Sequence, residues 1–297
     1  MTEYTFIDTI NILSLTEKNM NLLIDDIILT ALKEDVRTGD KTTNLLIEPN
    51  REAIATIRCK EEIILAGINV ALRTFQLIDE NVICEAEAYD GTLLKPFSII
   101  AKIKGKARSL LTAERTALNF LQHLSGIATE TYKLASIAKQ FSVTITDTRK
   151  TLPNLRYLQK YAVAISGGKN HRFALDDGIL IKNNHLKFFS SISEALIKIN
   201  KYKPYLTEIE IEVSSINELK EALKYKPAII MLDNFSYKDI KRAIALARGK
   251  CKIEISGRVT KENIEKIAAL KPDFISIGSL THSVNAVDIH MEIEPIN

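Results

Sequence analysis

The sequence predicts an α/β protein with two domains, an antiparallel sheet covered on one face followed by a closed or nearly closed parallel α/β barrel. The chain has 297 residues, 46% of them hydrophobic, which is enough for two cores. Three segments between residues 53 and 108 alternate between polar and apolar residues, and beyond residue 140 short apolar runs alternate with amphipathic helical segments. A doubly wound open sheet is the alternative to the barrel. No GxGxxG motif follows any apolar run, so a dinucleotide-binding fold gains no support.

The N-terminal half begins with helical spacing in LLIDDIILTALKE (22–34). Strict alternation then predicts strands over 53–60, 82–89 and 101–108, and a single polar face indicates an antiparallel sheet with one solvated side. In the last of these strands Ala101 and Ile103 face one side and the lysines face the other, which we interpret as ordinary solvent exposure. A long helix follows over 109–140, with an interruption expected near Gly126.

The C-terminal half has the strand–helix repetition of a parallel sheet. Strands are expected at 143–146, 161–165, 178–181, 208–213, 228–232, 252–256 and 274–278. Helices are expected at 191–202, 214–225, 236–248 and 260–270, and the first two open with the capping boxes Ser191–Glu194 and Ser215–Glu218. About seven strands favour an α/β barrel.

Polar groups stand at the carboxyl ends of nearly all these apolar runs, where barrel enzymes place their chemistry. The cationic groups are Arg149, Lys150, Lys169, His171, Arg172 and Lys182. The acidic groups are Asp147, Glu210, Glu212 and Asp233, and the segments SGR (256–258) and IGS (277–279) are small. Independent solvated loops would not favour one end so consistently, so we expect these residues to form part of a site.

This mixture of groups limits the ligand. A cationic group with two arginines suits carboxylates or phosphates, because a guanidinium binds them in a bidentate way. Glu212 and Asp233 would repel such a ligand unless a divalent metal or ribose hydroxyls lay between them. The small segments offer backbone N–H groups suited to a phosphate. The sequence therefore predicts an anionic small molecule together with a phosphorylated, metal-bound partner.

Other interpretations of the same residues remain open. Lys182 at a strand end also suits a Schiff-base lyase. His185 and His282 fit hydrogen-bonded structural roles. Glu210 and Glu212 share a face, so one of the two fits a salt bridge only. The helical pattern around Arg115, with Glu114 and Leu118 beside it, indicates a surface arginine rather than a catalytic one. A non-catalytic phosphate or nucleic-acid binder is a further class.

Composition excludes several kinds of protein. The net charge of +3 is too small to indicate a nucleic-acid partner. The three cysteines are far apart and form no CxxC motif, which favours a reducing compartment. The N-terminus lacks a secretory pattern, and the longest nearly uncharged apolar run, 63–72, is too short to span a bilayer. We expect a soluble, cytoplasmic protein with no membrane partner.

Taken together, these residues resemble the quinolinate phosphoribosyltransferase family, over about residues 22 to 290. The segments that carry the resemblance are EDVRTGDKTT (34–43), ERTALNFLQHLSGIAT (114–129), DTRKTLPNLRYLQKYAV (147–163), GGKNHR (167–172), LIKNNH (180–185), IEIEV (209–213), IMLDN (230–234), ISGRVT (255–260) and ISIGSLTHS (275–283). So many segments in the same order are more specific than any one of them.

The resemblance implies an N-terminal open-faced α/β sandwich, an incomplete parallel α/β barrel and a homodimer. We expect the sandwich to span 1–124, with the tail 284–297 returning to it, and the barrel to span 125–283. The implied reaction joins quinolinate and phosphoribosyl pyrophosphate to give nicotinate mononucleotide, pyrophosphate and carbon dioxide, with Mg²⁺, as in de novo NAD biosynthesis.

The resemblance also implies roles for individual residues. Quinolinate-binding positions match Arg149, His171, Arg172 and Lys182, with Thr148 beside them, and Arg115 matches an arginine that reaches the neighbouring subunit's site. Lys150, Glu212 and Asp233 match positions that handle phosphoribosyl pyrophosphate and, indirectly, its metal. Catalysis would fall to Lys150, Lys182, Glu212 and Asp233. Ser256, Gly257, Gly278 and Ser279 match the phosphate-binding turns.

The chain departs from the family pattern at four positions. Ser166, Ala174 and Arg258 stand where glycine is usual, and Asn183 stands where aspartate is usual. Arg258 lies beside a phosphate turn, where a side chain could help or obstruct binding. The rival closest to the leading prediction is a relative that keeps the fold and acts on another substrate, such as the molybdenum-associated paralogue. Retention of the cationic set argues for a dicarboxylate.

Overall fold

The computed structural model describes residues 17–296, and the side chains of 22–296. The chain forms two compact units. The first contains the residues up to Glu130, Leu152–Ser166 and the residues from Val284 onward, and the second contains Thr131–Thr151 and Gly167–Ser283. No helix among the described residues is long and apolar enough to cross a membrane.

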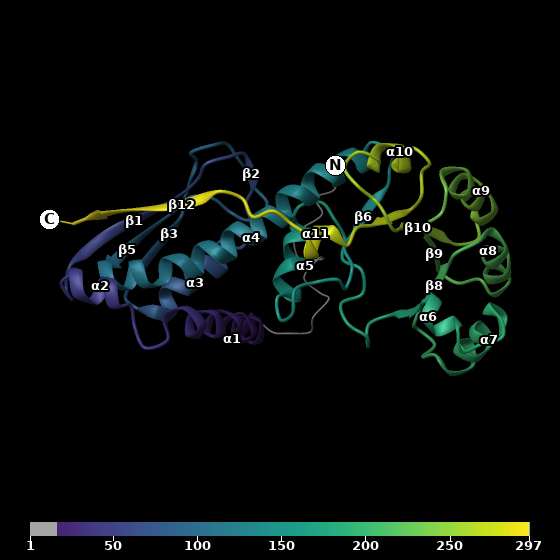
Figure 1. The fold of residues 1–297 in the computed structure, drawn as a ribbon, viewed down its shortest axis with the longest axis horizontal. Coiled ribbons are helices and arrows are strands. Elements are labelled where there is room, and N and C mark those ends of the chain that lie inside the picture. The colour runs from purple at the N-terminus through teal and green to yellow at the C-terminus, as the bar shows by residue number, and fades with distance from the viewer. Residues whose placement is uncertain (1–16, 297) are drawn as a thin grey trace. The chain divides into compact units, whose positions relative to one another are not determined.

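The first unit is an α/β sandwich with one sheet face covered by helices. Its sheet has the order β12-β1-β5-β3, in which β1 (Glu52–Cys59), β5 (Ile99–Lys106), β3 (Ile83–Ala86) and β12 (Ile289–Pro295) are antiparallel neighbours. Helices α3 (Ile68–Ile78) and α4 (Ala107–Lys139) cover one face (Figure 1). The alternation predicted for β1 and β5 is confirmed, because Ala55, Ile57 and Ile103 are fully buried. The opposite face is solvated, and Lys102 pairs there with Glu87 at 3.5 Å.

Smaller elements complete the first unit. The predicted N-terminal helix lies within α1 (Glu17–Val36), which is tied to α3 by a bidentate pair between Arg73 and Asp25, at 2.8 and 2.7 Å. Helix α2 (Lys41–Leu46) is capped by Asp40, whose side chain accepts from the Thr43 N–H at 3.0 Å. Strands β2 (Ile63–Ile64) and β4 (Leu93–Leu94) form a separate antiparallel pair.

Helix α4 is continuous, so the interruption predicted near Gly126 is wrong. Glycine is needed there because another segment of the chain passes against the helix, not because the helix ends. A Cβ atom at position 126 would lie 2.3 Å from the backbone oxygen of Asn285. The segment that leads into β12 thus packs directly on the helix backbone.

The strand predicted over 161–165 is also wrong, because these residues belong to helix α5 (Arg156–Ile165). Leu158, Ala162 and Val163 lie on one helical face and pack in a cluster with α1 and α4. The Tyr161 hydroxyl donates to Asp90 Oδ2 at 2.8 Å. Helix α5 therefore belongs to the first unit, whereas the expected boundary at 124/125 assigned residues 152–166 to the barrel.

The second unit is an incomplete parallel barrel. Its six strands have the order β6-β11-β10-β9-β8-β7 and comprise β6 (Thr144–Thr146), β7 (Ile179–Ile181), β8 (Ile209–Val213), β9 (Ile229–Asp233), β10 (Lys252–Ser256) and β11 (Phe274–Ser276). Within the described part of the chain, β6 and β7 are not paired with each other, so the barrel is open between them. The predicted fold class is confirmed, with six strands where about seven were expected.

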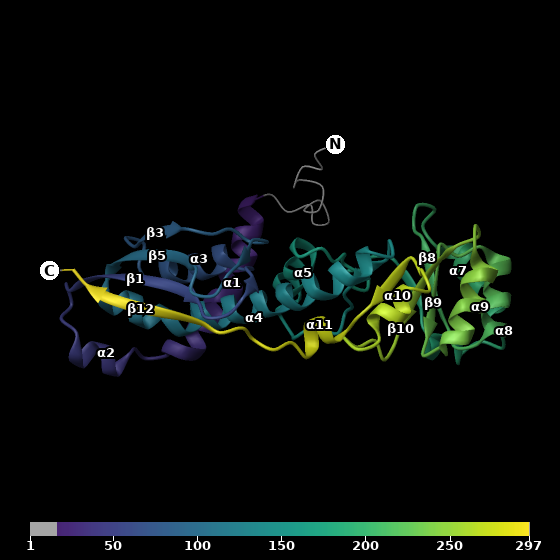
Figure 2. The same cartoon turned by 90° about the horizontal axis from the view of Figure 1, so that it is seen from above.

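Amphipathic helices lie along the outside of the second unit's sheet (Figure 2). These are α7 (Ile192–Tyr202), α8 (Ile216–Ala222) with the 3-10 turn η1 (Leu223–Tyr225), α9 (Tyr237–Ala247) and α10 (Ile264–Ala268), and the short α6 (Asn183–Leu186) and α11 (Ser279–His282) follow β7 and β11. Ser191 and Ser215 accept from the N–H groups of Glu194 and Glu218, as the sequence predicted. Isoleucine-rich strands supply the core, since both faces of a parallel sheet are covered.

Candidate active site

The strand ends of the second unit gather most of the polar side chains that the sequence singled out. All six strands are parallel, so their carboxyl ends meet at one edge. Arg149 and Lys150 follow β6, Lys182 follows β7, and Glu212 and Asp233 lie at the ends of β8 and β9. The loop containing Lys169–Arg172 joins this edge through a parallel bridge between Thr146 and Lys169. The site is therefore built on the rigid ends of a sheet.

Two arginines near this edge lie close enough to repel each other. Burial and the charge of Arg149 lower the pKa of Arg172. Arg172 donates from Nη1 to the backbone oxygen of Gly178 at 3.1 Å, but its buried Nε, like that of Arg149, has no hydrogen-bond partner among the described residues. A buried guanidinium nitrogen without a partner is costly. An anionic ligand would satisfy both groups and relieve their repulsion.

Asp147 fixes the loop that carries His171. It is fully buried, and its two carboxylate oxygens accept from the backbone N–H of His171 at 2.8 Å and from Asn170 Nδ2 at 2.7 Å. The sequence placed Asp147 at the end of the first barrel strand and gave it no specific role. Its contacts indicate that it orients the loop and does not face a ligand.

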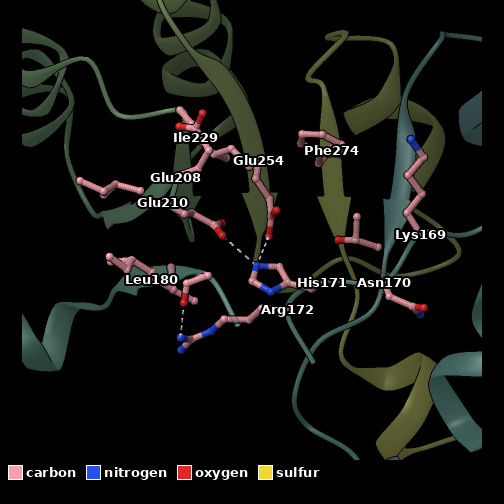
Figure 3. A pocket seen from close by; sticks show the side chains of 15 residues that line it. Lys169, Asn170, His171, Arg172, Leu180, Glu208, Glu210, Ile229, Glu254 and Phe274 are labelled. Atoms are coloured by element: carbon pink, nitrogen blue, oxygen red, sulfur yellow. Dashed lines mark hydrogen bonds and ion pairs between the residues drawn. The ribbon is translucent and has the colours of Figure 1, made fainter. Parts of the chain in front are cut away.

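His171 faces two further acids. Its Nε2 lies 2.9 Å from Glu210 Oε2 and 4.0 Å from Glu254 Oε1, and Figure 3 shows this ring nitrogen pointing at both carboxyl groups. Burial, and then the charge of Glu210, raises the pKa of Glu254 to about 7. The three side chains lie beside a cavity of about 330 Å³. Their ligand atoms lie within 4.8 Å of one another, so the group also has the composition of a metal site.

A second acidic pair lies at the ends of β8 and β9. Burial, and then the charge of Asp233, raises the pKa of Glu212, while Lys182 lowers it. Asn183 Nδ2 donates to Glu212 Oε1 at 2.9 Å, and Asn234 Nδ2 donates to Asp233 Oδ1 at 3.0 Å. A carboxylate whose pKa is raised by a neighbouring carboxylate fits a divalent cation, because a cation would relieve the repulsion. Mg²⁺ prefers oxygen ligands of this kind.

Lys182 is exposed and lies near the Glu212 carboxylate. A Schiff-base lysine needs a desolvated or cation-rich setting that lowers its pKa. Because Lys182 is exposed, its surroundings do not favour the lyase interpretation.

The two small segments form tight turns at the ends of β10 and β11. Gly257 has φ 88°, and a Cβ there would lie 2.5 Å from Asn234 Oδ1. At Gly278, a Cβ would lie 3.0 Å from Lys150 Cδ and 3.2 Å from His282 Nε2. Lys150 therefore lies against the Gly278–Ser279 turn, and the Thr281 hydroxyl holds its backbone oxygen at 2.8 Å. Close packing by Asn234, Lys150 and His282 thus accounts for both glycines, and it places a lysine beside the second turn.

Comparison with known proteins gives the same family. Residues 40–125 match the family model described as "Quinolinate phosphoribosyl transferase, N-terminal domain", and residues 127–292 match its C-terminal counterpart. A Methanocaldococcus jannaschii protein, named probable nicotinate-nucleotide pyrophosphorylase [carboxylating], is 41% identical over 276 residues, covering 90% of this chain and 96% of that protein. The chain belongs to the quinolinate phosphoribosyltransferase family.

Solved structures of this family have the same fold. NadC from Streptococcus pyogenes is 39% identical with a TM-score of 0.90, covering 96% of this chain and 100% of that one. The nicotinate-nucleotide pyrophosphorylase from Francisella tularensis is 39% identical with a TM-score of 0.88, covering 92% and 97%. The similarity therefore extends over both units.

One residue implied by the family resemblance, Arg115, stands apart from the strand-end set. Arg115 is exposed on α4, in the first unit, as its sequence pattern alone indicated. Thr148 is half-buried in the loop after β6, where its hydroxyl accepts from the Lys150 N–H at 3.0 Å. His185 has a structural contact, since its Nδ1 accepts from the Lys182 N–H at 2.9 Å.

The departures from the family pattern have local explanations at three positions. Ser166 ends α5 and donates from its hydroxyl to the Ala162 oxygen at 2.7 Å. Asn183 donates to Glu212, which an aspartate could not do when ionised. Arg258 has φ 53°, a left-handed conformation that favours glycine, and its side chain is exposed. Nothing in the structure explains Ala174.

Sequence reasoning missed Glu254 and Asn170. Glu254 lies inside the strand run KIEIS, two residues before Ser256 and on the same face of β10. A glutamate within an otherwise apolar strand was the available signal. Asn170 had no signal beyond its place between Lys169 and His171.

Proposed function

We propose that this chain transfers the phosphoribosyl group of phosphoribosyl pyrophosphate to quinolinate and releases carbon dioxide. The other products are nicotinate mononucleotide and pyrophosphate, which places the reaction in NAD biosynthesis. The observation that carries the proposal is the pair of close arginines, Arg149 and Arg172, each with a buried Nε that lacks a partner among the described residues. A ligand with more than one negative charge would form hydrogen bonds with both guanidinium groups and offset their repulsion.

Quinolinate has two adjacent carboxylates and so suits this cationic set. Arg149, His171, Arg172 and Lys182 would bind the two carboxylates, and the arginines would fix their orientation by bidentate contacts. The Asp147 contacts with the loop 170–171 would hold His171 in place for this role. Thr148 would support the turn that carries Arg149 and Lys150.

Phosphoribosyl pyrophosphate would occupy the ends of β8 to β11. The turns Ser256–Gly257 and Gly278–Ser279 would bind phosphate oxygens through their backbone N–H groups. Lys150, packed against Gly278, would neutralise phosphate charge. Glu212 and Asp233 would hold the ribose hydroxyls and, through the substrate or water, a Mg²⁺ ion. Bound Mg²⁺ would neutralise the pyrophosphate leaving group.

The protein groups then account for both chemical steps. The ring nitrogen of quinolinate attacks C1 of the ribose as pyrophosphate departs, and positive charge develops on the sugar. Glu212 and Asp233 would stabilise that charge. The quaternary ring nitrogen then accepts the electron pair of the breaking C2–carboxylate bond, carbon dioxide leaves, and C2 takes a proton. Lys150 and Lys182 would stabilise the charge that develops in these steps.

The site would be completed in a homodimer by Arg115 of the second subunit. Arg115 is exposed on α4 and belongs to the first unit, whereas the strand-end residues belong to the second. An exposed arginine of this kind is compatible with a role in a partner's site. A third arginine from a partner would add a further bidentate contact to the dianion.

Release of labelled carbon dioxide from quinolinate labelled in its 2-carboxylate tests the function directly. Release should require the protein, phosphoribosyl pyrophosphate and Mg²⁺ together. Glu208 is exposed and directly precedes β8, so Glu208→Gln serves as a control. This variant should release carbon dioxide at the rate of the unaltered chain. No release from folded protein would contradict the proposal and favour a relative that acts on another substrate.

A further inference from the structure

The side chain of Asn183 connects the ends of β7 and β8, and the proposed reaction gives it no role. Asn183 is the first residue of α6, directly after Lys182, and it is half-buried. Its Nδ2 donates to Glu212 Oε1 at 2.9 Å and to Ser214 Oγ at 3.0 Å. A side-chain amide carries two N–H hydrogens, so both contacts can form at the same time. Asn183 therefore holds the end of β8 at two points.

The acceptors decide which end of the Asn183 amide faces β8. An ionised carboxylate only accepts hydrogen bonds, and a serine hydroxyl can accept as well. If the amide were turned over, its oxygen would lie 2.9 Å from Glu212 Oε1 with no hydrogen between two acceptors. The NH2 group must therefore be the end that faces Glu212.

This contact matters because Glu212 lies beside a second acid. Burial, and then the charge of Asp233, raises the pKa of Glu212, whereas Lys182 and the backbone N–H of Asn183 lower it. Repulsion from Asp233 would turn the flexible glutamate side chain away from the strand ends. A hydrogen bond from an amide to a carboxylate is charge-assisted and stronger than one between neutral groups. The contact to Oε1 thus fixes the direction of the whole carboxylate.

The second acid of the pair is held in the same way. Asn234 Nδ2 donates to Asp233 Oδ1 at 3.0 Å. Each of the two neighbouring acids therefore has an amide donor of its own, and neither amide adds charge to the site. Both carboxylates can stay in place at the ends of β8 and β9 in spite of their repulsion.

We propose that Asn183 is a positioning residue that holds the Glu212 carboxylate toward the ribosyl group of phosphoribosyl pyrophosphate. This inference rests on the proposed function, which assigns Glu212 to the ribose hydroxyls and to the positive charge of the sugar. It adds a reason for asparagine at a position where the family pattern has aspartate. An aspartate would remove the donor and place a third carboxylate beside Glu212 and Asp233, so that only a bridging cation could hold the acids together.

Binding of phosphoribosyl pyrophosphate without quinolinate tests this role by titration calorimetry in the presence of Mg²⁺. Asn183→Ala should raise the Kd about 10-fold, the usual effect of losing a hydrogen bond to a charged group. The backbone N–H of residue 183 is kept in this variant. Asn184→Ala is the matched control, because Asn184 is the next residue, is exposed and contacts Lys187 Nζ at 2.9 Å instead of an acid. Its Kd should equal that of the unaltered protein.

A double-mutant cycle separates positioning from a structural effect. In a Glu212→Ala background, Asn183→Ala should change the Kd less than about twofold, because the carboxylate that it positions is gone. Ser214→Ala alone should likewise change the Kd less than about twofold. A purely structural role would give the same loss in both backgrounds. Equal losses, or a loss in Ser214→Ala as large as that in Asn183→Ala, would overturn the proposal.

Asn183→Asp tests the reason for the amide. Its loss of affinity should exceed that of Asn183→Ala at low Mg²⁺ and should shrink at saturating Mg²⁺, because a cation between the acids would replace the missing donor. The loss in Asn183→Ala, relative to the unaltered protein, should be the same at both Mg²⁺ concentrations. A loss in Asn183→Asp that does not depend on Mg²⁺ would contradict the proposal.

The two proposals fail in different ways. Crystal structures without ligand should show the Glu212 carboxylate displaced in Asn183→Ala and unmoved in Asn184→Ala. If the unaltered protein releases no carbon dioxide from quinolinate, the proposed function fails, and these structures still decide whether Asn183 holds Glu212. If carbon dioxide is released and the cycle shows no coupling, the function stands and the role of Asn183 is refuted. Circular dichroism shows whether each variant is folded.

Discussion

Replacement of Glu254 by glutamine should make the protein more stable at alkaline pH. Glu254 is 2% exposed, and burial raises its pKa from 4.5 to about 7 in the folded protein. A carboxyl group with a raised pKa contributes fully to stability below its unfolded value of 4.5. That contribution is lost as the pH rises through about 7, because the folded protein must then bury the charge. Glutamine mimics the neutral acid at every pH.

The magnitude follows from the interval between 4.5 and about 7. At about 1.4 kcal/mol for each pH unit, the interval corresponds to an upper value of roughly 3 kcal/mol. Glu254→Gln should therefore have nearly the unaltered stability at pH 4.5 and gain about 2 to 3 kcal/mol relative to the unaltered protein at pH 8. The gain should appear gradually between these values, since the charges of Glu210 and His171 both act on the Glu254 carboxyl.

Urea unfolding followed by circular dichroism measures this difference, because the chain has no tryptophan to report unfolding by fluorescence. Glu208→Gln is the matched control, since Glu208 is exposed and borders the same cavity. Its free energy of unfolding should differ from that of the unaltered protein by the same small amount at every pH. A stability difference for Glu254→Gln that does not change between pH 4.5 and pH 8 would refute the reasoning.

Four other changes test the remaining contacts. Gly126→Ala should lower the free energy of unfolding in urea by about 1 to 2 kcal/mol. The new Cβ would lie 2.3 Å from the Asn285 oxygen, and the cost of this clash exceeds the helix-propensity gain of about 1 kcal/mol. Ser136→Ala, at an exposed position on the same helix, should not lower stability. Tyr161→Phe should cost about 1 to 3 kcal/mol by removing the donor to Asp90, and an unchanged unfolding midpoint would show that this hydrogen bond contributes nothing. Arg258→Gly should gain up to about 1 kcal/mol by relieving φ 53°, whereas Arg258→Ala should not, so equal effects would exclude strain as the cause. Mixed chains of inactive Arg115→Ala and inactive Lys182→Ala should recover part of the carbon dioxide release, and none in confirmed heterodimers would argue against a shared site.

The sequence predicted elements well where one pattern dominated. The alternating β1 and β5 and the capped helices α7 and α8 fit a single period each. Residues 161–165 were misassigned because YAVAI taken alone has the β-branched, apolar character of a buried strand. Only the longer window from Arg156 shows the helical spacing of Leu158, Ala162 and Val163. Gly126 was misread because the segment that it contacts lies 159 residues further along the chain, at Asn285.

The site was predicted in part for a simple reason. Parallel strands bring their carboxyl ends together, so polar residues that follow the strands share an edge without any further information. Glu254 lies within its strand, so a search limited to strand ends passed over it. Its contact with His171 depends on how β10 sits relative to the loop 169–172, which the sequence does not specify. Exposure of Arg115 likewise says nothing by itself about a partner.

The antiparallel sheet of the first unit depends on the last strand of the chain. β12 pairs with β1 over seven residue positions from Ile289↔Cys59 to Pro295↔Ala53. During synthesis, the residues of the second unit, which end at Ser283, emerge before β12 does. The edge of β1 therefore stays uncovered while the whole second unit is translated, and an uncovered edge can pair with other chains. Synthesis of β12, rather than completion of the first 130 residues, sets the earliest time at which this sheet can be closed.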